Sequence, residues 1–158
     1  NLLNYEEFQN HISDLEASIQ AADNQIRQTK QAIQNQKVLK KHCEVYRACR
    51  DVVLAEKDAP DKALYRKQHQ AEYQLHDATL KELAEFGIHK LPSSEKLRRQ
   101  QLELEEELVS AKKEKQDLLK QQKTLGIIES NYETMLRGAG IDVPDRQPGG
   151  LIREEVIS

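Results

Sequence analysis

Apolar residues in the first third of the chain recur every seven positions. Four isoleucines carry this repeat, and Leu15 and Ala22 follow the first two of them after three residues. These isoleucines are Ile12, Ile19, Ile26 and Ile33. Two apolar positions in every seven predict a helix whose narrow seam packs against another helix. After this repeat the phase changes at Val38, and a broader apolar face is predicted up to Val53.

A second heptad repeat lies in the last long stretch of the chain, where leucine occupies one of the two seam positions and polar residues occupy most of the other. The leucines are Leu97, Leu104, Leu118 and Leu125. Antiparallel packing places the first seam position of one helix opposite the second seam position of its partner. That arrangement suits the isoleucine and leucine repeats. We therefore predict an all-α fold, a long antiparallel coiled-coil hairpin with a shorter third helix packed at the joint.

Proline and glycine divide the sequence into three predicted helices, at about 5–57, 60–86 and 94–137. Pro60 disfavours helical geometry at the residue before it, so the first helix ends there. Gly87 stands where a left-handed residue would close the second helix, with Ile88 in contact with Leu83. Ser93 is the predicted cap of the third helix.

Other features refine the helices. Asn4 and Glu7 have the spacing of a capping box at the start of the first helix. A thin apolar stripe along the second helix is the surface predicted to pack; it consists of Leu64, Ala71, Leu75, Ala78 and Leu83. Gly126, inside the third helix, is either a tolerated surface residue or a place where another helix approaches closely. Residues 1–138 are predicted to form one elongated three-helix domain, and residues 139–158 a flexible tail.

The composition agrees with long helices. Ala, Glu, Lys, Arg and Leu supply nearly half of the 158 residues, as in coiled coils, while hydrophobic residues reach only 37%. No stretch approaches the ~20 consecutive apolar residues that a membrane-spanning helix needs. The first residues lack the basic-then-apolar order of a signal peptide. A cytoplasmic location without a membrane span is therefore expected.

Charge is distributed unevenly along the first predicted helix. Residues 1–24 hold five acidic residues and no Lys or Arg, whereas residues 25–50 hold seven bases and one acid. Four of these bases share one side of a helix; they are Arg27, Lys30, Lys37 and Lys41. They either pair with acidic residues of the partner helix, Glu103, Glu105, Glu106 and Glu107, or contact the phosphates of a nucleic acid.

The residue spacing favours neither metal binding nor catalysis. His42 and Cys43 are neighbours and diverge by about 100° on a helix, and His42 and Cys49 are ~10 Å apart along its axis. Two metal ligands on one helix need a spacing of three or four residues. Cys49 is predicted to be a small buried apolar residue instead. We expect no metal, no cofactor, no small-molecule ligand and no catalytic residue in this chain.

Four segments resemble the C-terminal helical region of relaxases, the mobilisation nucleases of plasmids and integrative conjugative elements in Gram-positive bacteria. The segments are Lys41–Arg47, Tyr65–His69, Tyr73–Ala78 and Lys90–Ser93. The similarity spans residues 12–136, and its most recognisable element is the Leu91-Pro92-Ser93 connector before a helix rich in Glu and Lys.

The resemblance implies a bacterial cytoplasmic protein that supports conjugative DNA transfer. In that family an N-terminal domain nicks DNA at the transfer origin through a tyrosine and a metal bound to a His-hydrophobe-His motif. No His-x-His triplet occurs here, so no catalytic residue of the family is carried over. The expected role is a non-catalytic interaction and oligomerisation region, whose partners would be a second copy, transfer-origin DNA or proteins of the conjugation machinery. A DNA-binding arm using residues 27–50 and a generic structural coiled coil are the alternatives.

Overall fold

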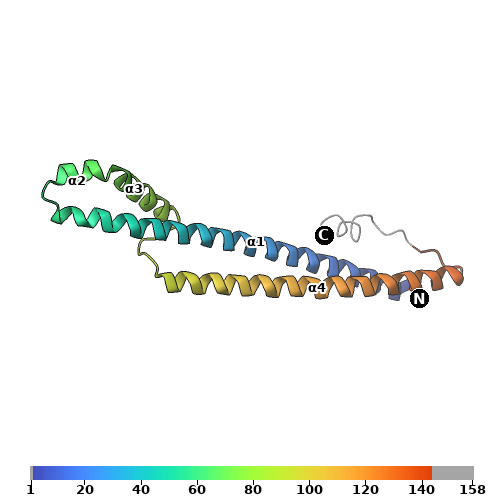
Figure 1. Ribbon diagram of the computed structural model, residues 1–158. Coiled ribbons are helices and arrows are strands. Elements are labelled where there is room, and N and C mark those ends of the chain that lie inside the picture. Colours follow the sequence, from blue (N-terminus) through green and yellow to red (C-terminus); the bar gives the residue numbers. More distant parts are fainter. Residues whose placement is uncertain (1, 144–158) are drawn as a thin grey trace. The chain divides into compact units, whose positions relative to one another are not determined.

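The computed structural model describes residues 2–143, and all the regular structure in that range is helical (Figure 1). The helices are α1 (Leu2–Leu54), the 3-10 helix η1 (Ala55–Asp58), α2 (Lys62–Gln68), α3 (Gln70–Glu85) and α4 (Ser94–Gly138). The all-α class and the hairpin of two long helices are confirmed. Most of the tail predicted at 139–158 lies outside the described residues.

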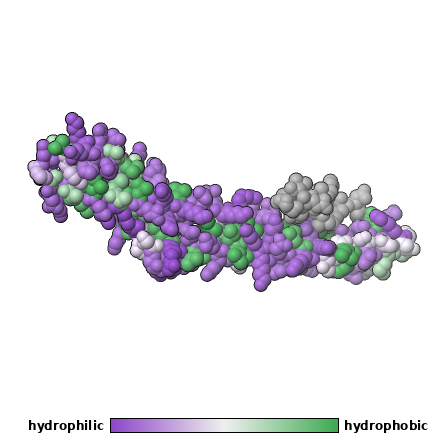
Figure 2. All heavy atoms as spheres, viewed as in Figure 1, coloured by the Kyte–Doolittle hydropathy of each residue, from purple (hydrophilic) through white to green (hydrophobic). Residues whose placement is uncertain are grey.

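The chain forms two compact units. Among the described residues, the first combines residues 2–28 with residues 107–143, and the second is Thr29–Glu106. Both α1 and α4 contribute residues to each unit. On the face shown in Figure 2, hydrophobic side chains form interrupted clusters among hydrophilic ones.

In the first unit, α1 and α4 pack antiparallel. The Tyr5 hydroxyl donates a 2.6 Å hydrogen bond to Glu133, Gln9 donates to Glu129, and Asp23 forms a 2.7 Å ion pair with Lys115. Each step forward along α1 is matched by an equal step backward along α4. The apolar side chains buried in this unit are Tyr5, Ile12, Leu15, Ile19, Ala22, Ala111 and Leu136.

In the second unit, a small core joins α1, α3 and α4. It consists of Leu39, Cys43, Leu83 and Leu97, with Tyr46, Ile88 and Leu91 packed against it. Polar contacts surround this core. The Gln36 amide donates to Gln100 Oε1 at 3.0 Å and to the Leu97 carbonyl, and the Arg47 guanidinium donates to the Pro92 carbonyl and to Ser94 Oγ.

Two helix termini predicted in the second half of the chain are confirmed, the glycine stop at Gly87 and the serine cap at Ser93. Gly87 has φ +74°, and its N–H donates to the Ala84 carbonyl while the Ile88 N–H donates to the Leu83 carbonyl, which is the Schellman pattern. Ser93 Oγ accepts a 3.1 Å bond from the backbone N–H of Lys96 at the start of α4.

The capping box predicted at Asn4 is wrong, because α1 already includes Leu2 and Asn4 lies within the helix. A side chain in that position has no free backbone N–H to satisfy at the residues that follow it.

The single helix predicted at 60–86 is also wrong, since the chain bends at His69, where φ is −112° and ψ is 25°. Side chains on both sides of the bend are tied to α1: the Tyr65 hydroxyl donates to the Val52 carbonyl, and the His76 ring stacks on Tyr46 with centroids 5.2 Å apart. No glycine or proline marks this bend in the sequence. Tertiary contacts on both sides of His69 therefore account for it.

The apolar stripe predicted to pack the second helix is exposed along most of its length. Leu64 and Leu75 are each 49% exposed, Ala71 and Ala78 are exposed, and only Leu83 is buried. The adjacent side of α2 and α3 faces α1 instead. This side consists of the partly or fully buried Tyr65, His69, Glu72, Tyr73, His76, Thr79 and Leu83.

Candidate functional site

The eight predicted seam residues are buried to different degrees. Ile12, Ile19, Ile33 and Leu97 are buried, whereas Ile26, Leu104, Leu118 and Leu125 are partly buried. In α4 the deepest side chains of the first unit include two from the polar seam position, Gln122 at 8% and Glu129 at 7% exposure. Glu129 accepts a hydrogen bond from Gln9, so this carboxylate enters the seam with a partner.

A tyrosine and two carboxylates define the end of the first unit at Tyr5. Its ring stacks on Tyr132 with centroids 5.5 Å apart, and its hydroxyl donates to Glu133. Burial, followed by this hydrogen bond and the negative charges of Glu133 and Glu129, raises the pKa of Tyr5 to about 12. The phenol therefore stays protonated and acts as a donor, which makes it a structural group rather than a general base at neutral pH.

The four candidate nucleic-acid contacts, Arg27, Lys30, Lys37 and Lys41, are all exposed. Arg27 belongs to the first unit and donates to Asn24 Oδ1 at 3.3 Å. The three lysines belong to the second unit, where we call them the basic track. They lie on the side of α1 opposite Leu39 and Cys43, and span ~16 Å along the helix axis.

Direct pairing with the acidic residues of α4 does not occur. Within residues 4–143, none of the four cations forms an ion pair, either with Glu103, Glu105, Glu106 and Glu107 or with any other carboxylate. The basic track therefore presents three ammonium groups to solvent, which is the arrangement that phosphate binding requires.

Aromatic and histidine side chains make up much of the surface where α2 and α3 meet α1. His76 stacks on Tyr46, and the His42 ring meets Phe86 edge-on with centroids 6.0 Å apart. Nothing in the apolar pattern marked these residues as packing residues. The spacing of Tyr65, His69, Glu72, Tyr73 and His76 at three and four residues was the available signal.

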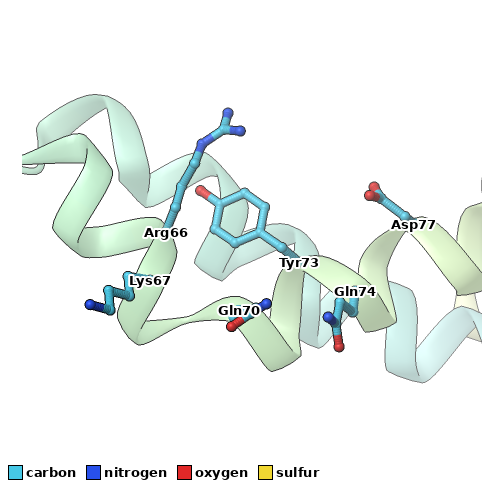
Figure 3. A pocket seen from close by; sticks show the side chains of 6 residues that line it. All are labelled: Arg66, Lys67, Gln70, Tyr73, Gln74 and Asp77. Carbon is cyan, nitrogen blue, oxygen red and sulfur yellow. The ribbon is translucent and has the colours of Figure 1, made fainter.

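A pocket lies on α2 and α3 around the bend (Figure 3). Its lining residues are Arg66, Lys67, Gln70, Tyr73, Gln74 and Asp77. The Arg66 guanidinium lies 5.1 Å from the centre of the Tyr73 ring and pairs with Glu56. The hydrogen bond between Arg66 and Glu56 lowers the pKa of the carboxyl and raises that of the guanidinium, while burial raises the pKa of Tyr73. Because Arg66 is already paired, and Lys67 and Asp77 have opposite charges, the pocket selects neither anions nor cations.

The two cysteines are both free and buried. Cys43 is completely inaccessible in the core of the second unit, and burial raises the pKa of its thiol, so it is a packing residue rather than a reactive thiolate. Sequence reasoning predicted this role for Cys49 and missed it for Cys43. Residues 2–143 contain no group of three or more His, Cys, Asp or Glu side chains placed to hold a metal ion.

A groove opens along the side of the hairpin in the first unit. It is lined by His11 from α1 and by Lys120, Gln121, Thr124 and Leu125 from α4. Ile128 follows Leu125 and Thr124 by three and four residues and is 45% exposed, so it lies on the same side of α4 as these two lining residues. His11 and Lys120 are the only ionisable side chains among the lining residues of the groove.

No family model, curated protein or solved structure matches this chain. The likeness to relaxases therefore remains a prediction based on the four segments that carry it. In the part of the chain that the structure describes, no helix has the length and apolar character needed to span a membrane.

Proposed function

We propose that this chain is a non-catalytic interaction region of a DNA-mobilisation relaxase, which supports conjugative transfer by binding partners. The observation that carries the proposal is a helical hairpin whose seam is buried while large apolar and charged side chains stay exposed. On α4, Val109 is 69% exposed and Met135 is 72% exposed. The lysines of the basic track on α1 are exposed as well. The assignment to relaxases is supported by the sequence resemblance alone.

The test is a transfer assay with the gene that encodes this chain. Deleting the codons for residues 4–143 should lower the mobilisation frequency, while nicking of transfer-origin DNA by the remaining protein persists. A deletion that leaves the transfer frequency unchanged contradicts the proposal. Loss of nicking together with transfer contradicts its non-catalytic part, provided that the shortened protein accumulates normally.

DNA contact by the basic track is a second candidate function, favoured by its three exposed lysines without ion pairs. Neutralising a phosphate contact lowers the slope of log affinity against log salt concentration by about 0.9 for duplex DNA. Replacing Lys30, Lys37 and Lys41 with Gln should therefore weaken binding at low salt and flatten this slope.

A matched control keeps the change in net charge but moves it to α4, where Lys112, Lys113 and Lys123 are also exposed. Replacing these three with Gln should reduce DNA affinity much less than the substitutions in the basic track. Equal losses in the two triple variants would mean that net charge, rather than the basic track, governs binding. No binding of either single-stranded or duplex DNA at low salt would overturn this candidate.

A further inference from the structure

The groove in the first unit leaves apolar side chains of the hairpin uncovered. A two-helix hairpin buries only the seam between its helices, and stable domains usually pack a further layer against such a surface. Leu125 is partly buried at the floor of the groove, Ile128 is 45% exposed, and Met135 continues the row seven residues later at 72% exposure. This row presents apolar side chains at helical spacing to a partner.

The two rims of the groove each carry an exposed charged side chain that a second copy could pair with, an aspartate on α1 and a lysine on α4. On α1, Glu7 and Asp14 lie four residues before and three residues after His11, so all three share one side of the helix. On α4, Lys120 lines the groove, and Asp117 lies three residues before it on the same side of the helix. Glu7, Asp14 and Lys120 are exposed, and none of them forms an ion pair within the described residues. Asp14 on one rim and Lys120 on the other are groups of opposite charge that a two-fold rotation can bring together.

The register of the hairpin determines which two-fold rotation brings these charges together. A rotation axis parallel to the helices places α1 of one copy over α4 of the other, in the opposite direction. Such a rotation does not shift residues along the axis, so the residues of α1 and of the other copy's α4 that lie at the same level are those that meet within one hairpin. There Gln9 meets Glu129 and Asp23 meets Lys115. Asp14 therefore lies at the level of Thr124, one helical turn from Lys120, which is within reach of a lysine side chain.

We propose that a second copy of this chain docks in the groove, so that two hairpins form an antiparallel four-helix bundle with a two-fold axis along the helices. Ile128 of each copy packs against α1 of the other near His11, and Asp14 pairs with Lys120 of the opposite copy. Such an isologous interface repeats each contact twice. This inference deepens the proposed interaction function, because it names the partner and the surface.

Sedimentation equilibrium of the full chain over a concentration series tests the docking. The chain should dimerise. Ile128→Glu should remove the dimer, because it buries a charge in an apolar contact. The matched control is Val109→Glu, which changes an apolar residue of α4 that is 69% exposed and lies about three helical turns before Lys120, outside the groove, and which should leave the dimer intact. Circular dichroism and the urea midpoint of each monomer establish that both variants fold.

Charge exchange tests the orientation. Asp14→Lys and Lys120→Glu should each weaken dimerisation by about tenfold, since like charges then meet twice in each dimer. An equimolar mixture of the two variants should restore wild-type affinity, because both contacts of the mixed dimer again join opposite charges. A chain that stays monomeric, an unchanged dimer in Ile128→Glu, or a mixture that is no tighter than either variant overturns the proposal.

These results are separable from the transfer assay. A monomeric chain that is still required for mobilisation contradicts only the dimer, and another protein then occupies the groove. A dimeric chain that is dispensable for mobilisation contradicts only the proposed function.

Discussion

The two places where helices pack differ in how their contacts are built. In the first unit, α1 and α4 meet through a seven-residue repeat of aliphatic side chains, with Ile12 and Ile19 almost fully buried. In the second unit, α2 and α3 meet α1 mostly through stacked rings and hydrogen bonds, exemplified by His76 on Tyr46 and by Tyr65 on the Val52 carbonyl, with Leu83 as the one aliphatic side chain of α3 in the small core. The rest of the apolar stripe on α2 and α3 remains in solvent.

This difference between the two units shows when the period of apolar residues determines which side of a helix packs. Along a long helix pair, each heptad adds similar buried area, so the apolar side outweighs every other side. Two short helices have little apolar area to bury along a stripe of two leucines and two alanines. A few aromatic rings and one buried leucine can bury as much area on the adjacent side. Aromatic side chains bury large areas and add favourable stacking, so they can determine which side packs.

The largest expected effect is on the aliphatic seam. Ile19 is 1% exposed, and Ile19→Ala should lower the free energy of unfolding by about 2–5 kcal/mol, because it removes buried methyl groups and leaves a cavity. Urea denaturation followed by circular dichroism measures this change. Ile127→Ala, at an isoleucine 57% exposed, is the control and should change stability by less than about 0.5 kcal/mol.

A smaller effect is expected at the ion pair that crosses the seam. The side chains of Asp23 and Lys115 are 13% and 19% exposed and 2.7 Å apart. Lys115→Met should destabilise the chain by about 1–3 kcal/mol, less than for a fully buried pair, because water still reaches both groups. Replacing both residues together, as Asp23→Leu with Lys115→Met, should recover much of the loss. A double variant as unstable as Lys115→Met would show that the unpaired carboxylate is not the cause.

The contact between Tyr5 and Glu133 should make stability depend on pH in the alkaline range. Since the pKa of Tyr5 is raised from 10.0 to about 12 in the folded chain, its contribution is present below pH 10 and is lost as the pH rises toward 12. Tyr5→Phe should cost about 1–2 kcal/mol at neutral pH and reduce the fall in urea midpoint over that window. An unchanged alkaline fall in Tyr5→Phe would assign the effect to other groups.

The smallest effect is a gain. A methyl group added at Gly126 would meet nothing within 4 Å, and the residue lies in helical conformation inside α4. Gly126→Ala should therefore stabilise the chain by about 0.8–1 kcal/mol, from helix propensity alone. Gly87→Ala is the contrasting variant and should destabilise, because Gly87 has φ +74°. The midpoint temperature of thermal denaturation should rise in Gly126→Ala and fall in Gly87→Ala.

Much of the fold followed from local chemistry in the sequence. The Schellman end at Gly87, the cap at Ser93 and the antiparallel pairing of the long helices depend on residue type and period, which the sequence displays directly. The bend at His69 and the exposure of Leu64 and Leu75 depend on which side chains of α1 are within reach. The apolar pattern of α2 and α3 carries no information about that.

The candidate sites also divide into features that the sequence displays directly and features that depend on tertiary contacts. Exposure of the basic track followed from its position on α1 opposite the apolar side. The buried Gln122 and Glu129 were not expected to be among the deepest seam residues, because a heptad pattern ranks positions by apolar character. Their burial depends on hydrogen-bond partners on the other helix, such as Gln9 for Glu129. Cys43 was missed because its depth depends on α3 and α4 covering one spot on α1.

The most direct test of which side of α3 packs against α1 compares two leucines of α3. Leu83 is 3% exposed and Leu75 is 49% exposed, and both become alanine without loss of helix propensity. By urea denaturation, Leu83→Ala should lower the free energy of unfolding by about 2–5 kcal/mol, whereas Leu75→Ala should change it by less than about 0.5 kcal/mol. Equal losses, or a larger loss in Leu75→Ala, would mean that the apolar stripe packs after all and would contradict the account.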